Sequence, residues 1–489
     1  MFKSATKTLK ATSLLQRSAV ATFSTATPSE SNFDSRMFLA AGAALVGGYF
    51  AYNQAKTAMS DPEYPPEGLS ANVLTLPHFI RLGCGSAEYI CAEKGATFTG
   101  QVMPRECPDL SGHSNFMTDA LIANPTLYDA LKDKKTALGV TLGQCIKTGI
   151  DNKGHPHIKT CGIVAGDEES WTLFAPLFDH VIDKRHNGYK PWDRHPTDMN
   201  PDNLSKRQLD PTGKYILTTR CRTGRSVRGF RLPPCNSFDE RREIERLVVE
   251  GLLKLDGDLK GDYYPLHGSR SYAAKPTGMS EAEMDDLRNR GNLFQEPDST
   301  LLLSSGCGRH WPDARGIFHN EEKTFFVWLN EEDHMRIISM QKGDGVVPIF
   351  NRFAKATKVI QEVLTGAGYD FMHNDHLGYV LTCPSNLGTG LRAGAMVQIP
   401  HVSGRKDFKE LCGRLGLQAR GCGGVDSASV GGTWDVSNAD RLGKSETTLV
   451  NIFIEGTANF IRWEGMLEQG QHAAVDAEIA RAQPGKSCI

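Results

Sequence analysis

Short runs rich in β-branched and aromatic residues follow Asp210 at irregular intervals, and this spacing constrains the fold more than any other feature. A doubly wound fold needs strands that alternate regularly with helices, and no such repeat is present. Helical periodicity occupies residues 239–255 and 347–368 between the runs. We therefore expect a mixed or antiparallel sheet covered by helices. The predicted strands span residues 214–222, 300–306, 323–330, 335–341, 378–385, 395–400 and 448–456.

The chain before Asp210 has a different pattern, which indicates a separate helical region. Residues 116–133 and 170–186 place apolar side chains at three- and four-residue steps, and a turn-rich stretch, residues 190–203, follows them. A chain of 489 residues is long enough for two domains. We predict a helical domain over residues 106–205 and a second, larger domain over residues 210–480.

The N-terminal region has the composition of a targeting sequence. Residues 1–27 are rich in Ser, Thr, Lys and Arg and contain no acid, and an apolar run follows at residues 37–52. We expect residues 1–58 to target the protein to mitochondria, to the intermembrane space or the inner membrane, with residues 59–105 as an extension or linker. The apolar run is either part of a bipartite signal, an inner-membrane anchor, or a helix of the mature domain. An anchored structural protein is thus a competing hypothesis.

Charge and cysteine content exclude several classes of protein. The formal net charge is -2, so no global basic field indicates a nucleic-acid partner. The twelve cysteines form no CxxC pair, which argues against a zinc site or a small disulfide framework and favours free thiols.

Five arginines stand at the ends or edges of the predicted strands. Guanidinium groups bind phosphate oxygens with two parallel hydrogen bonds, and several together neutralise a polyphosphate. Two of the five are two residues apart on one strand and share a face. Ordinary surface salt bridges are the alternative for any one of them. The five are Arg220, Arg222, Arg336, Arg392 and Arg420.

The run WLNEEDHMR places Glu331, Glu332 and Asp333 directly after an apolar strand. A carboxylate there can hold a cationic group or accept a proton from it, whereas a solvated turn is the ordinary alternative. We expect the adjacent His334 to be a hydrogen-bonded structural residue.

The run LTCPSNLGTGLRAG contains Cys383 at the predicted end of a strand, with Ser385 and Arg392 close in sequence. A hydroxyl and guanidinium groups lower the pKa of a thiol and favour the thiolate. Nucleophilic catalysis needs a nearby base, which the sequence does not identify, and a core cysteine is the alternative.

These motifs resemble the signatures of the guanidino phosphagen kinases. The likeness covers residues 108–470 and rests on CPSNLGTGLRAG, WLNEEDHMRIISM and TTRCRTGR. Within that family, KTGIDNKGHPHIKT and VAGDEESW are most similar to creatine kinases, and the basic leader to those of mitochondrial type. The resemblance implies an α+β fold: a small all-helical N-terminal domain, then a larger domain with an antiparallel sheet flanked by helices. It also implies a homodimer or octamer.

The resemblance further implies reversible transfer of the ATP γ-phosphoryl group to a guanidine, with Mg²⁺ held through nucleotide and water and without direct protein ligands. Creatine is the expected acceptor, with arginine or taurocyamine as alternatives. Glu332 would orient and deprotonate the guanidinium, Glu331 and Asp333 would support substrate or solvated magnesium, and the Cys383 thiolate would position the substrate. The five arginines and Asp435 would bind nucleotide.

The resemblance assigns substrate specificity to Ile158, Val425 and Arg185. A pocket for the N-methyl group of creatine needs small apolar residues, and one methyl is worth only about 1–3 kcal/mol. Gly291 and Met396 stand where family members carry histidines that contact the nucleotide. A catalytically impaired scaffold that binds nucleotide is therefore an alternative hypothesis. Residues 267–276 are an insertion without an assigned role.

Overall fold

The computed structural model describes residues 103–155, 158–272, 279–297, 299–421 and 431–483, all of which belong to one compact unit, Ser70–Ile489. The expected targeting segment, its apolar run and Val425 lie outside the described residues, as do nearly all of the 59–105 extension and residues 273–276 of the insertion. In the described part of the chain, no helix has the length and apolar character needed to cross a membrane.

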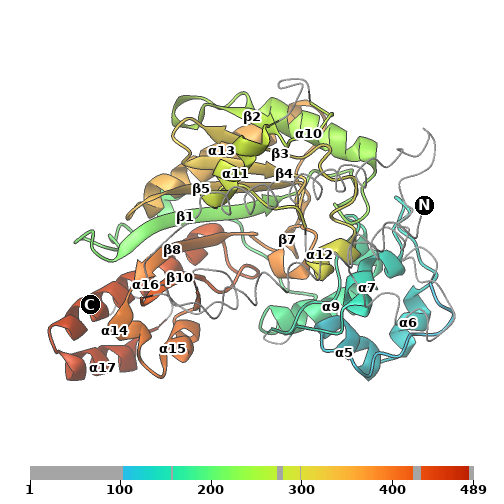
Figure 1. The fold of residues 1–489 in the computed structure, drawn as a ribbon. Helices are drawn as coiled ribbons and strands as arrows, with labels where there is room; N and C mark the ends of the chain where they lie inside the picture. The colour runs from blue at the N-terminus through green and yellow to red at the C-terminus, as the bar shows by residue number, and fades with distance from the viewer. Residues whose placement is uncertain (1–102, 156–157, 273–278, 298, 422–430, 484–489) are drawn as a thin grey trace, which may run out of the picture. The chain divides into compact units, whose positions relative to one another are not determined.

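An eight-stranded antiparallel sheet forms the centre of the larger part of the fold, in the order β2-β3-β4-β5-β1-β8-β10-β9 (Figure 1). A separate two-stranded sheet pairs β6 with β7. The strands are β1 (Ile216–Arg225), β2 (Gly261–Pro265), β3 (Gly316–Asn320), β4 (Phe325–Leu329), β5 (Met335–Lys342), β6 (His373–Asn374), β7 (Gly378–Tyr379), β8 (Arg392–Gln398), β9 (Leu417–Arg420) and β10 (Thr433–Asn438).

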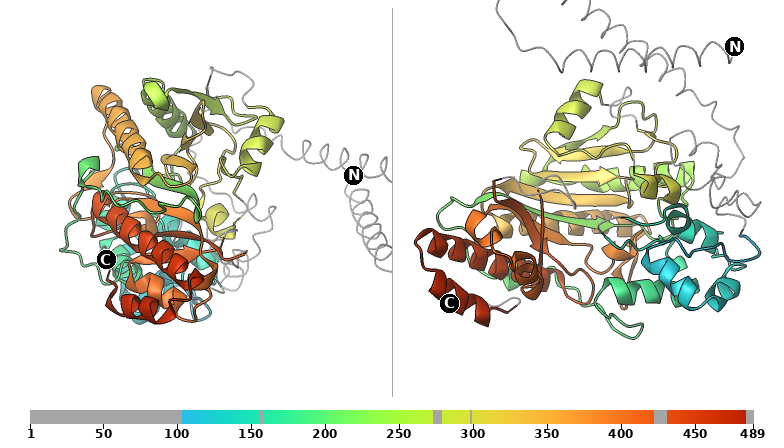
Figure 2. Two further views of the ribbon diagram at one scale, coloured as in Figure 1. Left: turned by 90° about the vertical axis from the view of Figure 1, so that its left-hand side faces the viewer. Right: turned by 60° about the horizontal axis from the view of Figure 1, so that its bottom comes forward.

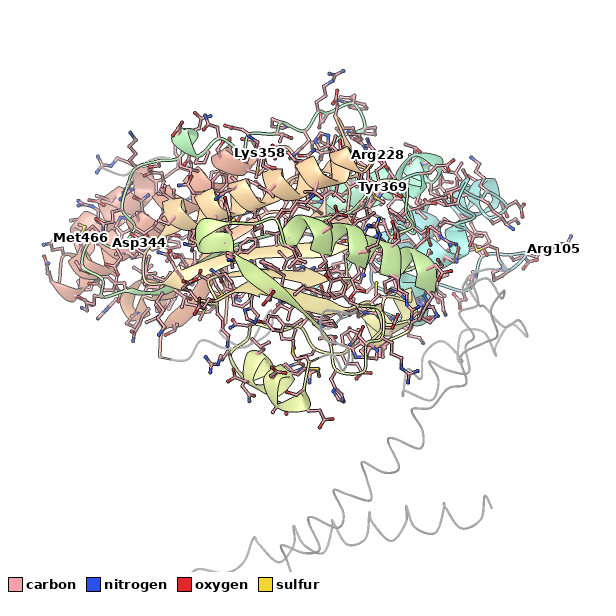
Figure 3. The ribbon with its side chains drawn as sticks, turned by 90° about the horizontal axis from the view of Figure 1, so that it is seen from above. Arg105, Arg228, Asp344, Lys358, Tyr369 and Met466 are labelled. Atoms are coloured by element: carbon pink, nitrogen blue, oxygen red, sulfur yellow. The ribbon has the colours of Figure 1, made fainter. Side chains whose placement is uncertain are left out.

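Two long helices, α10 (Phe238–Leu252) and α13 (Val346–Gly366), pack against each other, and α13 contacts β1 and β5 (Figure 3). The helix α10 begins at a capping box, in which Ser237 and Glu240 bond each other's backbone N–H groups. Apolar side chains of α13 at helical spacing, including Phe350, Phe353 and Ile360, are buried in the main core.

The C-terminal helices pack at the other end of the sheet, where α16 contacts β8, β9 and β10 (Figure 2). This group comprises α14 (Pro400–Ser403), α15 (Phe408–Arg414), α16 (Glu446–Glu468) and α17 (His472–Arg481). Two shorter helices, α11 (Glu281–Asn289) and α12 (Thr300–Ser305), lie in the connection from β2 to β3.

Five helices near the N-terminus of the described chain surround a second core, which includes Met117, Ile146, Phe174 and Phe178. They are α5 (Phe116–Ala123), α6 (Thr126–Leu131), α7 (Leu142–Asp151), α8 (Ser170–Leu173) and α9 (Ala175–Arg185). The backbone N–H of Ala165, in the segment before α8, donates to the carbonyl of Thr382 at 2.8 Å. This bond ties the helical region to the cysteine loop.

The predicted α+β class, with a helical N-terminal region and an antiparallel sheet, is confirmed. Two predicted strands are wrong: residues 300–306 contain α12, and residues 448–456 lie within α16. A short apolar run does not distinguish a buried strand from a buried helix. Here Gly306, with φ of 90°, ends α12, and the Ser445 side chain caps α16. The run 378–385 is strand only at β7.

Candidate functional site

The three central strands bring arginines from distant parts of the chain together. In the register of β1 with β8, Arg222 lies opposite Arg392, and in the register of β1 with β5, Gly224 lies opposite Arg336. Arg220, two residues before Arg222, is on the same face of β1. The predicted clustering of these guanidinium groups is therefore present in the fold.

Asp435 on β10 connects several members of this group. Its Oδ2 atom accepts from Arg392 Nη2 at 2.9 Å and forms an ion pair with Arg220. Arg420 lies opposite Asp435 in the register of β9 with β10. Asp435 is thus placed to hold arginine side chains in position through their ion pairs.

The side chain of Arg222 makes no hydrogen bond or ion pair with any described residue, whereas the other four predicted arginines each have a side-chain partner. Burial lowers the pKa of Arg222 well below its usual value, and the positive charges of Arg336, Arg392, Arg220 and Arg441 lower it further. A guanidinium without a partner among like charges favours the binding of an anion.

Arg441 is a member of the group that the sequence reasoning did not single out. Its Nη1 atom donates to the carbonyl of Ser385 at 2.8 Å and to the side chain of Asn386. Burial lowers the pKa of Arg441 to about 10, as does the charge of Arg185. Arg441 lies within residues 108–470, the region that carries the resemblance, but no spacing rule assigned a role to it.

Positive charge exceeds negative charge at this site. Seven guanidinium groups interact electrostatically with one another: Arg185, Arg220, Arg222, Arg336, Arg392, Arg420 and Arg441. The carboxylates paired with them are Glu331, Glu332, Asp333 and Asp435. The excess of three positive charges matches a polyphosphate.

The acidic run follows β4, and Arg336 at the start of β5 holds all three of its carboxylates. Arg336 Nη2 donates to Glu332 Oε2 at 2.8 Å, Nη1 lies 3.2 Å from Glu331 Oε2, and Nη2 lies 3.7 Å from Asp333 Oδ2. Burial alone would lower the pKa of Arg336, but these carboxylates raise it above its usual range. Glu332 stays 24% exposed, and its other oxygen accepts from Asn386 Nδ2 at 3.3 Å.

Asp333 connects the acidic run to the cysteine loop. Its side chain is buried, and Oδ1 accepts from the backbone N–H of Thr382 at 2.9 Å, whereas Oδ2 has no hydrogen-bond partner among the described residues. Burial and the negative charge of Glu332 together raise the pKa of Asp333 to about 7, although the positive charge of Arg336 opposes the shift.

His334 is fully buried and bonded to backbone on both ring nitrogens. Val227 N–H donates to Nδ1 at 3.0 Å, and Nε2 donates to the carbonyl of Arg231 at 2.9 Å. Burial lowers the pKa of His334 to about 4, so the ring is neutral. These bonds agree with a structural role.

Asn330 fixes the turn that leads into the acids. Its backbone has φ of 54°, and its side-chain amide donates to the carbonyls of Arg241 at 3.0 Å and Ala314 at 2.7 Å. The fully buried Arg315 donates to the Asn330 carbonyl at 2.9 Å. These hydrogen bonds hold the turn that carries Glu331, Glu332 and Asp333 in one conformation.

Cys383 lies in the loop after β7, just before the 3-10 helix η3 (Pro384–Asn386), and not at the end of a strand as predicted. Its sulfur is 3.2 Å from Ser385 Oγ. A hydrogen bond from the Cys161 thiol lowers the pKa of Cys383, the Ser385 hydroxyl lowers it further, and burial opposes them. The sequence reasoning found Ser385 but missed Cys161, because nothing in the sequence brings residues so far apart together.

Of the three residues assigned to substrate specificity, Ile158 and Arg185 are among the described residues and Val425 is not. Ile158 is 42% exposed, and Arg185 at the end of α9 interacts with Arg441 and Cys161. Of the two departures from the family pattern, Met396 lies opposite Asp435 in the register of β8 with β10, next to the arginine group. Gly291 has φ of 70°, and a Cβ atom there would meet open space.

An anion site beside clustered carboxylates and a thiol, on an antiparallel sheet with a helical partner region, defines a phosphotransferase that acts on a basic acceptor. Sequence models of the ATP:guanido phosphotransferase N-terminal domain and C-terminal catalytic domain match residues 111–183 and 243–467. The chain belongs to this family, the phosphagen kinases, and is a guanidino phosphotransferase.

Creatine kinases are among its relatives. The chain is 53% identical to the B-type creatine kinase of Gallus gallus and 51% identical to the M-type of Canis lupus familiaris. Each match covers 75% of this chain and 93% of the relative.

Two solved structures share the fold. A lombricine kinase matches with a TM-score of 0.69 and 42% identity, over 75% of this chain and 98% of that one. The duplicated taurocyamine kinase of Schistosoma mansoni matches with a TM-score of 0.65 and 33% identity, over 76% of this chain and 49% of that one.

Proposed function

We propose that the protein reversibly transfers the γ-phosphoryl group of ATP to the guanidino group of creatine. The observation that carries the proposal is the arrangement around Arg336, whose guanidinium holds the Glu331, Glu332 and Asp333 carboxylates and interacts electrostatically with Arg222. Arg336 joins the acidic run to the arginine group. A guanidine held by the acidic run therefore faces a phosphate chain held by the arginine group.

The arginine group binds the nucleotide phosphates in this proposal. Phosphoryl transfer requires charge neutralisation and in-line alignment more than covalent chemistry. Arg222 offers a guanidinium without a partner among the described residues, while Arg220 and Arg392 are held by Asp435. The group therefore presents phosphate-binding donors that are in place before the nucleotide arrives.

Glu332 and Cys383 present the acceptor. The carboxylate of Glu332 accepts a proton from the guanidinium as its nitrogen attacks the γ-phosphorus. The Cys383 thiolate attracts the same cation from a second side and remains free of covalent bonds to substrate throughout. Asp333 acts as a positioning residue, because it binds the backbone of Thr382 next to the cysteine.

Magnesium fits this arrangement when the nucleotide phosphates hold it. The Oε2 atom of Glu331 is buried and lies 3.2 Å from Arg336 Nη1, and Asp333 is buried and paired with backbone, so neither carboxylate is placed to ligate the ion directly. The ion would neutralise phosphate charge as the bond to the γ-phosphorus breaks. Neither carboxylate is proposed as a direct ligand.

Creatine is favoured over other guanidines by sequence likeness and by the two apolar residues assigned to the pocket. The relatives at 51–53% identity are creatine kinases. Ile158 supplies an apolar side chain on one side, and Val425 is proposed to supply the other. Lombricine or taurocyamine is the second candidate, since the matching solved structures carry those names.

We also propose that residues 1–58 direct the protein to mitochondria and are removed, and that the mature protein is a homodimer or octamer. The acid-free leader of residues 1–27 supports the targeting. Mass spectrometry of the N-terminus of protein isolated from its cell tests this. A mature terminus beyond the apolar run of residues 37–52 agrees with removal, and retention of that run supports an anchor.

A coupled assay of ADP release tests the substrate, with creatine, arginine, lombricine and taurocyamine each supplied with MgATP. The proposal expects kcat/KM to be highest for creatine. If creatine gives no turnover while another guanidine does, the pocket assigned to Ile158 and Val425 is wrong. No turnover with any of them would favour a nucleotide-binding scaffold.

A further inference from the structure

Arg441, which follows β10, is tied to two separate points of the loop between β7 and β8. Its side chain reaches the first point, where Nη1 donates to the carbonyl of Ser385 at 2.8 Å and to Oδ1 of Asn386. Its backbone carbonyl reaches the second point, because it accepts from the N–H of Thr389 at 3.0 Å and from the Thr389 hydroxyl at 3.2 Å. A guanidinium Nη atom carries two hydrogens, so protein acceptors use both hydrogens of Nη1.

Asn386 extends this attachment to the proposed base. A side-chain amide accepts through its oxygen and donates through its nitrogen. Because Arg441 only donates, the Oδ1 atom of Asn386 faces Arg441, and Nδ2 faces Glu332 Oε1 at 3.3 Å. The reverse orientation would place two donors together at Arg441 and two acceptors together at Glu332. Arg441 therefore determines which end of the amide meets the carboxylate.

Arg336 alone does not fix the Glu332 carboxylate. Its Nη2 atom donates to Glu332 Oε2 at 2.8 Å, but the same guanidinium also pairs with Glu331 and Asp333. One hydrogen bond leaves a carboxylate able to rotate about its terminal bond, whose torsion is broad. The bond from Asn386 to Oε1 removes this freedom, while the Glu332 side chain stays 24% exposed and open to an acceptor.

We propose that Asn386 and Arg441 are positioning residues for the phosphoryl transfer. Arg441 sets the direction of the Asn386 amide, and the amide holds Glu332 Oε1 so that the carboxylate faces the acceptor nitrogen before the substrate binds. This inference rests on the proposed function, in which Glu332 accepts the guanidinium proton. It separates Arg441 from Arg222, whose guanidinium has no partner among the described residues and is available to phosphate.

Asn386→Asp tests the amide, because it keeps an acceptor for Arg441 but replaces the N–H donor with an oxygen. We expect kcat to fall about 10–100-fold, the usual worth of a hydrogen bond to a charged group, with KM for ATP unchanged. The added negative charge disfavours ionised Glu332, so the acidic limb of kcat against pH moves to higher pH. A loss of packing alone would lower kcat without moving that limb.

Asn351→Asp, on the exposed side of α13, is the control and should keep the kcat and the pH profile of the parent. Thermal unfolding of each variant checks that it is folded. Should Asn386→Asp not fold, Asn386→Ala replaces it and should show the same loss of kcat. A folded Asn386 variant with the kcat and pH profile of the parent overturns the proposal.

Arg441→Met separates positioning from phosphate binding. Without Arg441 the Asn386 amide is free to turn, so kcat should fall, whereas KM for ATP should rise less than in Arg222→Met. In an Asn386→Ala background there is no amide to orient, and Arg441→Met should lower kcat little further. A loss of kcat in that background as large as in the parent overturns the proposal, as does a loss confined to KM for ATP.

Crystal structures of the parent and of Arg441→Met without substrates read the same link independently of turnover. Glu332 should lie within hydrogen-bond distance of Asn386 in the parent and should turn away or occupy several conformers in the variant. One unchanged Glu332 conformer in both overturns the proposal. A parent that shows this difference but phosphorylates no guanidine supports the orientation of Glu332 and contradicts the proposed function alone. A parent that phosphorylates creatine as fast as its Asn386 variants contradicts the positioning alone.

Discussion

Arg336 donates from Nη2 to the Oε2 atom of Glu332 at 2.8 Å, and this ion pair spans the boundary between two chemically different halves of the site. On one side lie the acidic run and the cysteine loop, and on the other lie Arg222 and the remaining guanidinium groups. The second Glu332 oxygen accepts from Asn386 Nδ2, so the carboxylate is oriented from both sides in the absence of a substrate. Such preorganisation avoids rearrangement during the reaction.

Replacing Glu332 by glutamine should lower kcat by about 10²–10⁴-fold, the usual contribution of a general base. Glutamine keeps the shape of the side chain but does not accept the guanidinium proton. Steady-state kinetics with MgATP and the guanidine acceptor measures the change. Glu362→Gln, on the exposed side of α13, is the matched control and should leave kcat unchanged. A Glu332→Gln enzyme as fast as the parent would show that another group takes the proton.

Replacing Arg222 by methionine should weaken nucleotide use while preserving or increasing stability. The Arg222 guanidinium has no partner among the described residues and lies among like charges, so its removal relieves repulsion in the free protein. We expect kcat/KM for ATP to fall on the order of 10²-fold, as when one donor to a charged transition state is lost. Kinetics and thermal unfolding are measured together, with the exposed Arg246→Met on α10 as control. Lower stability with normal nucleotide use would contradict the assignment.

Asp333 should make stability depend on pH between about 4 and 7. An unfolded aspartate has a pKa near 3.9, whereas burial raises the pKa of folded Asp333 to about 7. The folded protein binds more protons between these values, so this contribution is complete below about pH 4 and is lost as pH rises through about 7. Urea unfolding across this range should show the decline in the parent and a smaller decline in Asp333→Asn.

The exposed Asp262→Asn serves as the control for the pH experiment and should keep the decline of the parent. An Asp333→Asn protein whose free energy of unfolding changes with pH as the parent's does would mean that Asp333 is ionised throughout.

Asn330→Ala should destabilise the fold and slow the reaction together. The change leaves the carbonyls of Arg241 and Ala314 without the Asn330 amide, each buried loss costing about 1–3 kcal/mol, and places alanine at a φ of 54° that it disfavours. The turn that carries Glu331, Glu332 and Asp333 then becomes less rigid, and these carboxylates are held less accurately for the reaction. Chemical unfolding and kcat are the readouts. Normal activity in a destabilised variant would show that the turn supports the fold alone.

The sequence predicted most of the fold where periodicity was strong. The helices α10 and α13 and the strands β1, β4 and β5 lie where apolar spacing placed them. The errors fell on short apolar runs: residues 448–456 resemble a strand locally, but they belong to the longer helix α16, whose period emerges only over its full length. β2, β3, β9 and β10 were missed because short strands carry little pattern of their own.

The candidate site was predictable as a set of residues but not as a geometry. Guanidinium groups at strand ends and a run of acids are visible in the sequence. By contrast, the pairing of Asp435 with Arg392 depends on β8 lying next to β10, and the bond from Ala165 N–H to the Thr382 carbonyl depends on how the helical region packs. Such long-range neighbours follow from topology, which local pattern does not determine.

The most direct test of the central claim is ³¹P NMR of the protein incubated with MgATP and creatine. The account predicts a phosphorus signal of an N-phosphorylated guanidine that grows as the γ-phosphate signal of ATP declines, and its reversal when ADP is added in excess. Inorganic phosphate as the only new signal, or an unchanged ATP spectrum with creatine and with every other guanidine, would contradict it.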